Sequence, residues 1–176
     1  DLYEIAFKRF YQDELDLYLQ ENKNNFDEYI YNNYNSLIIK KGGWVNTEIL
    51  LENWKNFLKD NKSYMKEDLK YSDLKIEENK IQYKNFSFNK IVFCEGYKAI
   101  NNPFFENLPF QLSKGEVLKI KSDLPKDIIL KKQIYLVNLE NDIYKVGSTY
   151  EWNDLNNNLT LKGIQKLKNN LNEFLK

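Results

Sequence analysis

The sequence contains no histidine and only one cysteine, Cys94, among its 176 residues. Without an imidazole side chain, there is no histidine-ligated metal site and no catalytic triad or dyad with histidine as its base. A single cysteine cannot form an internal disulfide, and Cys94 follows the apolar run 91–93, where a free thiol usually packs as a small hydrophobic group. These features predict no metal site and a reducing, cytoplasmic location.

Glycine is scarce and neither sign of charge is in excess. The 6 glycines form no Gly-x-Gly-x-x-Gly pattern and no phosphate loop, so the chain alone has no signature for binding a dinucleotide pyrophosphate. The 26 basic and 26 acidic residues cancel, which removes the basic surface typical of nucleic-acid binding. No apolar run approaches the roughly 18 residues of a membrane span. We therefore expect neither a nucleic-acid partner nor a membrane span.

Aromatic residues, by contrast, are abundant: 3 Trp, 13 Tyr and 11 Phe occur in a chain that is 42% hydrophobic. This composition predicts a packed core, and the length suits one domain, so we expect a single folded unit over residues 1–176. The chain begins with Asp1 instead of methionine. We interpret it as a processed or excised piece of a longer protein.

Helical spacing of apolar residues predicts three helices. The first covers residues 2–21, the second is capped by Asn46 or Thr47, and the last is capped by Thr160. In the last helix the residues expected to face the core are Leu161, Ile164, Leu167, Leu171, Phe174 and Leu175. A short buried strand is expected within 34–41, where Gly42 and Gly43 end it.

Alternating apolar residues predict the strands. Residues 71–98 read as three short strands, with a hairpin turn near 77–80 and the last strand ending at 94–96. An aromatic loop with two prolines follows, and then strands are expected at 116–121, 128–130, 133–138 and 143–148. The predicted fold class is α+β, with a mixed, largely antiparallel sheet and helices packed on one face.

Three short segments are candidates for binding. Lys114-Gly115-Glu116 places a cation and a carboxylate around a glycine, which suits an anionic ligand, although a solvated turn is the competing interpretation. Residues 147–152 bring hydroxyls, rings and a carboxylate to a strand end, and would either line a pocket or simply lead into a helix. Gly43 and Trp44 would bring backbone and an indole to a ligand, or form a tight turn.

The order of these motifs resembles the FAD-dependent D-amino acid oxidase and glycine oxidase family. The motifs are Lys90-Ile91-Val92-Phe93-Cys94-Glu95-Gly96-Tyr97, Leu108-Pro109-Phe110, Lys114-Gly115-Glu116-Val117-Leu118, Tyr135-Leu136-Val137 and Val146-Gly147-Ser148-Thr149-Tyr150-Glu151. The resemblance covers residues 90–176, and 42–47 looks like the turn into a helix of the substrate domain. Two positions depart from it: Glu95 replaces a small residue, and Asn138 replaces a proline.

The resemblance implies that the chain is chiefly the substrate-binding domain of a longer flavoenzyme, in which 71–98 return toward the FAD-binding domain. Such an enzyme moves hydride from an amine or amino acid to FAD, and the missing FAD-binding segments belong to the same polypeptide. The implied substrate contacts are Tyr135, Tyr150 and Lys114. The implied cofactor contacts are Gly96, Gly115, Gly43 and Trp44. We expect the isolated fragment to be inactive and without bound FAD.

Two alternatives remain open. One is a stand-alone module that binds a protein or ligand without catalysis, using the exposed aromatic loop with Phe104, Phe105 and Phe110. The other lies within the enzyme class: the related oxidase that trims a carboxymethylaminomethyl group on transfer RNA. The neutral charge argues against this last alternative.

Overall fold

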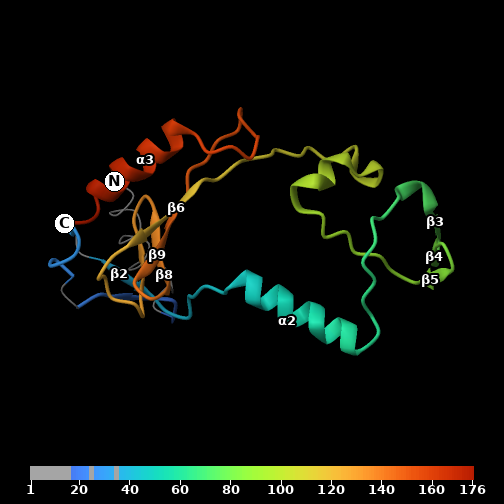
Figure 1. Cartoon of the computed structure of the whole chain (residues 1–176), viewed down its shortest axis with the longest axis horizontal. Coiled ribbons are helices and arrows are strands. Elements are labelled where there is room, and N and C mark those ends of the chain that lie inside the picture. The colour runs from blue at the N-terminus through green and yellow to red at the C-terminus, as the bar shows by residue number, and fades with distance from the viewer. Residues whose placement is uncertain (1–16, 24–25, 34–35) are drawn as a thin grey trace. The chain divides into compact units, whose positions relative to one another are not determined.

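The computed structural model describes residues 17–23, 26–33 and 36–176 (Figure 1). The chain groups into two compact units, instead of the single unit that its composition predicts over residues 1–176. The first unit combines the chain up to Trp44 with Ser113–Lys176, and the second is Val45–Leu112.

A four-stranded antiparallel sheet forms the centre of the first unit, in the order β6-β9-β8-β7. Its strands are β6 (Val117–Lys121), β7 (Ile129–Lys131), β8 (Tyr135–Glu140) and β9 (Ile143–Gly147). Asn141 and Asp142 connect β8 to β9 with φ of 47° and 64°, the left-handed conformation that a two-residue hairpin requires. All four strands and this turn confirm the sequence prediction.

The hydrophobic core of the first unit lies between this sheet and the C-terminal helix α3 (Leu161–Asn172) (Figure 1). The side chains buried in it are Ile30, Leu124, Ile134, Leu136, Tyr144, Val146, Leu167 and Phe174. The Tyr144 hydroxyl donates a hydrogen bond to the Leu124 carbonyl, so the polar end of this buried ring has a partner. Alternation along β8 and β9 and helical spacing along α3 together explain which residues face inward.

Helix α3 begins as predicted at Thr160, whose hydroxyl accepts a hydrogen bond from the Gly163 N–H at 2.9 Å. One predicted core residue is wrong: Leu161 is 87% exposed. It lies in the first turn, about 120° around the helix from Leu167, because successive residues are separated by about 100°. The other predicted residues of this face are buried or half-buried.

The two short N-terminal strands correct part of the first predicted helix. β1 (Leu19–Glu21) pairs antiparallel with β2 (Leu37–Ile39), so the end of the helix predicted over 2–21 is a strand. Pairing with a distant segment here outweighs the local helical pattern. Residues 1–16 of that prediction lie outside the described residues. β2 confirms the strand predicted within 34–41, but Ile39 is exposed and the strand is not buried.

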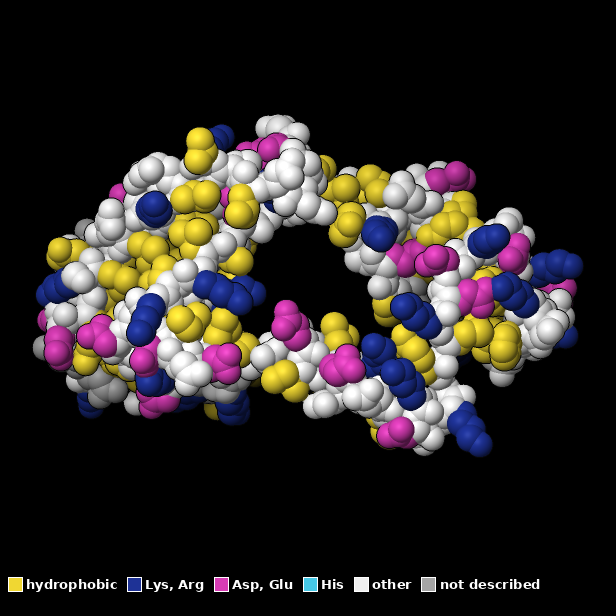
Figure 2. Space-filling view, in the orientation of Figure 1, with side chains coloured by type: hydrophobic (Ala, Val, Ile, Leu, Met, Phe, Trp, Pro, Cys, Tyr) yellow, Lys and Arg dark blue, Asp and Glu magenta, His cyan; other side chains and the backbone are white. Residues whose placement is uncertain are grey.

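The second unit opens with helix α2 (Thr47–Asp60), which confirms the predicted helix. The Asn46 side chain caps it by accepting hydrogen bonds from the N–H groups of Glu48 and Ile49 at 3.2 and 3.3 Å. Although the sequence is amphipathic, the structure as described buries no α2 side chain. Figure 2 shows hydrophobic side chains on the surface beside charges of both signs.

A three-stranded antiparallel meander follows, in the order β3-β4-β5. Its strands are β3 (Leu74–Glu77), β4 (Lys80–Tyr83) and β5 (Phe86–Phe88). The third predicted strand ends at Phe88 and not at 94–96, because β4 is too short to pair with the residues beyond Phe88. The 3-10 helices η2 (Tyr71–Asp73), η3 (Gly96–Asn101) and η4 (Pro103–Phe105) complete the unit.

The mixture of helices and antiparallel sheets confirms the α+β class. The described strands form sheets of two, three and four strands instead of one mixed sheet, and all their pairings are antiparallel. Helix α3 packs on the four-stranded sheet within the first unit, and α2 belongs to the second unit. Among the described residues, no helix has the length and hydrophobicity needed to cross a bilayer.

Candidate functional site at the end of the four-stranded sheet

Three of the sequence motifs meet at one end of the four-stranded sheet. Gly147 is the backbone partner of Val117 on one side and of Tyr135 on the other, so these residues form one row across three strands. A methyl group at Gly147 would lie 2.7 Å from Val117 Cγ1 and 3.0 Å from the Tyr135 hydroxyl oxygen. Glycine is therefore required here so that the Tyr135 side chain can cross β9.

The backbone pairing continues past this row into the Lys114 and Thr149 segments. The Thr149 N–H donates to the Glu116 carbonyl at 3.1 Å, and the Glu116 N–H donates to the Thr149 hydroxyl at 2.9 Å. Lys114 and Glu151 exchange two backbone hydrogen bonds of 2.8 and 2.9 Å. A methyl at Gly115 would lie 3.2 Å from the Thr149 carbonyl oxygen, so glycine here allows the two backbone segments to approach closely. Gly115 does not have a left-handed φ.

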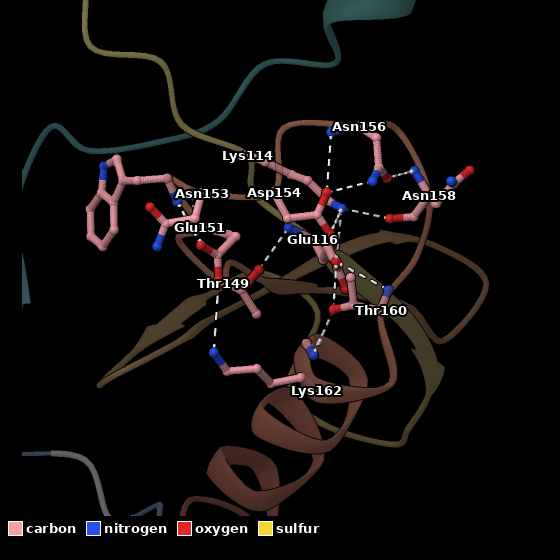
Figure 3. Close-up of polar contacts among 12 residues, drawn as sticks. Lys114, Glu116, Thr149, Glu151, Asn153, Asp154, Asn156, Asn158, Thr160 and Lys162 are labelled. Atoms are coloured by element: carbon pink, nitrogen blue, oxygen red, sulfur yellow. Dashed lines mark hydrogen bonds and ion pairs between the residues drawn. The ribbon is translucent and has the colours of Figure 1, made fainter.

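The Lys114 ammonium lies close to three oxygen atoms (Figure 3). It donates to the Asn158 carbonyl at 2.6 Å and lies 3.5 Å from Glu116 Oε1 and 3.8 Å from Asp154 Oδ2. Its side chain is only 12% exposed. Lys114 therefore joins β6 to the loop that precedes α3, and two carboxylates balance its charge.

Glu116 places a carboxylate at the N-terminus of α3 (Figure 3). The residue is 7% exposed, and Oε1 accepts hydrogen bonds from the Thr160 N–H at 3.2 Å and the Thr160 hydroxyl at 2.9 Å. Oε2 has no hydrogen-bond partner among the described residues and lies where a side chain at Gly163 would otherwise be. Negative charge at this end of a helix is favourable because the first N–H groups are unpaired.

The pKa of the Glu116 carboxyl reflects opposing effects. Burial alone raises the pKa, but the hydrogen bonds from Thr160 and the nearby Lys114 ammonium outweigh burial, so the net pKa lies below its ordinary value. The carboxylate is therefore ionised at neutral pH, and it acts as a fixed negative charge between β6 and α3.

The loop between β9 and α3 is ordered by its own polar side chains. Glu151 Oε1 accepts hydrogen bonds from the N–H groups of Trp152 and Asn153 at 3.0 and 2.9 Å. These bonds lower the pKa of the Glu151 carboxyl. The rings of Tyr150 and Trp152 stack with centroids 6.4 Å apart, and they are 64% and 55% exposed.

The predicted substrate contacts all lie in the first unit. Tyr135 is half-buried beside Gly147, Tyr150 is exposed, and Lys114 is held by the loop, so an approaching anion would have to compete with its present partners. Their roles in substrate binding stay predictions.

The predicted cofactor contacts are divided between the two units. Gly115 lies at the sheet end, and Gly43 and Trp44 belong to the same unit. Gly96 belongs to the second unit, where its φ of 56° matches the conformational freedom expected of glycine. No described atom lies within 4 Å of a methyl built at Gly43 or Gly96.

The N-terminus of α3 does not suit the pyrophosphate of FAD. A dinucleotide pyrophosphate commonly lies at a helix N-terminus, but the carboxylate of Glu116 already occupies this end of α3 and would repel a phosphate. Among the described residues there is also no group of three or more side chains suited to a metal ion. A flavin pyrophosphate would therefore need a binding segment other than the start of α3.

Sequence reasoning missed the pairing of Glu116 with Thr160 and Gly163. The signals for it were present as separate features: an acidic residue at a strand start, and a threonine followed by a glycine three positions later. Only the fold brings them together across 44 positions.

No protein-family model matches the sequence. No solved structure matches the fold.

Proposed function

We propose that this chain is the substrate-binding portion of an FAD-dependent oxidoreductase similar to D-amino acid oxidase and glycine oxidase, acting on an amine or amino acid. One observation supports the proposal most strongly. The segments Lys114-Gly115-Glu116, Tyr135 and Gly147-Ser148-Thr149 are far apart in the sequence, yet they meet at one sheet end. Residues that act in one site have to lie close together in the fold, and these segments do.

The chain's own contribution would be substrate orientation. Tyr135 places its hydroxyl over Gly147 in the row with Val117, and this hydroxyl can donate to or accept from a small polar substrate. The flavin, when bound by other segments of the polypeptide, supplies the hydride acceptor, so no histidine base is needed. The exposed apolar face of α2 is consistent with further segments that cover it.

Changing Tyr135 to Phe in the full polypeptide encoded by the gene tests this proposal. We expect kcat/KM for the amine substrate to fall about threefold to tenfold, because one orienting hydrogen bond is lost, while flavin occupancy is unchanged. Steady-state kinetics with the flavin content measured from absorbance gives both values. Tyr144→Phe is the matched control, because that hydroxyl bonds the Leu124 carbonyl in the core and should affect stability alone.

Two results would contradict the proposal. Unchanged kcat and KM in Tyr135→Phe would remove Tyr135 from the site. A reading frame without a Gly-x-Gly-x-x-Gly unit upstream of Asp1 would remove the family assignment itself, because the pyrophosphate would have no binding segment.

A second candidate is an interaction module without catalysis, and the exposed face of α2 favours it. Ile49, Leu50, Leu51, Trp54 and Phe57 are all more than half exposed, and the last two rings stack at 5.3 Å. An apolar surface of this kind commonly marks a binding interface. The aromatic loop fits less well, because Phe104 and Phe105 pack on Phe93. A start codon immediately before Asp1 would favour this candidate over the enzyme.

A further inference from the structure

The meander of the second unit has one apolar face. In its register, Leu74 pairs with Tyr83, and Tyr83 pairs with Phe86. Ile76, Ile81 and Phe88 form the neighbouring row on the same face. Because side chains alternate along a strand, the opposite face carries polar residues such as Lys75, Gln82 and Ser87. The sheet therefore presents six apolar side chains on one side.

Two irregular segments, 65–69 and 90–92, border part of this face and leave a pocket of about 320 Å³. The pocket lies wholly within the second unit. Its apolar lining includes Met65, Leu69, Phe88 and Ile91. Its size falls at the lower end of the range for sites that bind small organic molecules.

Of the two charged side chains that line this pocket, Glu67 has an ion-pair partner among the described residues and Lys90 does not. The Glu67 carboxylate contacts the Lys84 ammonium and accepts a hydrogen bond from the Tyr83 hydroxyl at 3.2 Å, so its charge is balanced. Lys90 also lines the pocket, and no carboxylate of the described residues lies within ion-pair distance of it. The uncompensated charge beside the apolar lining is therefore positive.

We propose that this pocket binds a small organic anion with an apolar body, namely a medium-chain or aryl carboxylate. The apolar body would cover Met65, Leu69, Phe88 and Ile91, and the carboxylate would pair with Lys90. This site is separate from the sheet end described above, and it does not depend on the proposed oxidoreductase function. An anion is favoured over a neutral or cationic ligand because the Lys90 ammonium has no carboxylate partner among the described residues.

Met65 makes a direct test possible because it is the only methionine in the chain. Its methyl group, isotopically labelled, gives one NMR signal from inside the pocket of the full chain. Octanoate, octanamide and octylammonium share an alkyl body and differ in charge. We expect octanoate to shift the Met65 signal saturably, with about threefold to tenfold higher affinity than octanamide, and octylammonium to bind most weakly.

Lys90→Gln should lower the octanoate affinity to that of octanamide and leaves Met65 as the only labelled methionine. Lys98→Gln is the matched control because Lys98 is exposed and does not line the pocket. The proposal is overturned by an unshifted Met65 signal, by equal affinity for the three ligands, or by unchanged octanoate binding in Lys90→Gln. If Lys90→Gln fails to fold, the ligand series on the unchanged chain decides alone.

Discussion

Glu116 shows how one buried carboxylate connects distant parts of the first unit. Its Oε1 accepts two hydrogen bonds from Thr160, and its charge is balanced by the Lys114 ammonium at 3.5 Å. Burial of a charge is unfavourable unless hydrogen bonds and an opposite charge compensate for it. Oε1 has both kinds of partner, whereas Oε2 has no hydrogen-bond partner among the described residues, and the carboxylate connects β6 to α3 through Oε1.

Glu116→Gln should destabilise the chain in a pH-dependent way. The folded-state pKa is below its ordinary value of 4.5, so the ionised carboxylate contributes stability above that pH and loses it as the pH falls through the folded pKa. We expect the variant to be less stable by about 1–3 kcal/mol near pH 7, and the difference to shrink near pH 3. Urea unfolding at both pH values measures this.

The control for this experiment is Glu140→Gln, an exposed glutamate at the end of β8. It should change the free energy of unfolding by less than about 0.5 kcal/mol. A Glu116→Gln effect of equal size at both pH values would contradict the assigned role of the charge.

Gly163→Ala should also be destabilising, which is the reverse of the usual helix rule. Alanine normally favours a helix interior by about 0.5–1 kcal/mol over glycine. A methyl at Gly163 would lie 2.7 Å from the Glu116 Cδ and nearer still to Oε2, so we expect a loss of about 1–3 kcal/mol.

A double-mutant cycle with Glu116→Ala isolates this clash. In that background the cost of Gly163→Ala should shrink, because the carboxylate is gone and only the Thr160 hydroxyl oxygen, 2.9 Å from the methyl position, remains close. The free energies of unfolding of the four proteins give the coupling. Equal effects of Gly163→Ala in both backgrounds would show that Glu116 does not occupy the space beside the glycine.

At the scale of elements, two amphipathic helices have different surroundings. Helix α3 places Leu167 in the core of the first unit, whereas α2 buries no side chain within the described structure. Both helices have capping residues, Asn46 and Thr160. Capping and periodicity therefore account for where each helix begins. The packing of its side chains determines how much each helix contributes to stability.

Leu167→Ala and Leu161→Ala make a matched pair within α3. Leu167 is 1% exposed, and its truncation should cost about 2–5 kcal/mol because it leaves a cavity. Leu161 lies in the first turn with an exposed side chain, and its truncation should change stability by less than about 0.5 kcal/mol. Thermal or urea unfolding measures both, and similar costs would contradict the packing of α3.

Sequence reasoning works for these elements where neighbours along the chain decide the structure. The Asn141-Asp142 turn, the Thr160 cap and the alternation of β8 and β9 all depend on local residue types. It fails where a distant partner decides. Leu19–Glu21 becomes a strand only because Leu37–Ile39 pairs with it, and the Glu116 contacts need α3 in place. For the same reason the sequence located the segments of the candidate site but not their contacts.

At the scale of the whole molecule, the chain consists of two compact units with separate buried residues. The first has the four-stranded sheet and α3, and the second has α2 and the meander. The two candidate sites follow this division, one at the sheet end and one at the meander. Each can therefore be tested without reference to the other.

The purified chain should be colourless and should show no oxidase activity. The sequence has no Gly-x-Gly-x-x-Gly unit to hold a pyrophosphate, and the Glu116 carboxylate occupies the start of α3. Visible absorption of the purified protein measures this, with denatured protein as the control for released cofactor. A stoichiometric flavin band near about 450 nm would contradict the expectation.

The contact between the segment near Ile30 and the end of the chain has a consequence for the order of folding. The Tyr31 N–H donates to the Phe174 carbonyl at 2.9 Å, and the Lys176 N–H donates to the Tyr29 carbonyl at 3.0 Å. The Lys176 ammonium also donates to the Asp27 carbonyl, which lies 149 positions earlier in the sequence. Closing so long a loop in an unfolded chain costs about 4 kcal/mol of free energy through lost chain entropy, before the contact stabilises the fold. The hairpin of β8 and β9 closes across two residues and forms without that cost. During synthesis, the segment at Ile30 therefore lacks its backbone partners near Phe174 and Leu175 until α3 and the residues after it have left the ribosome.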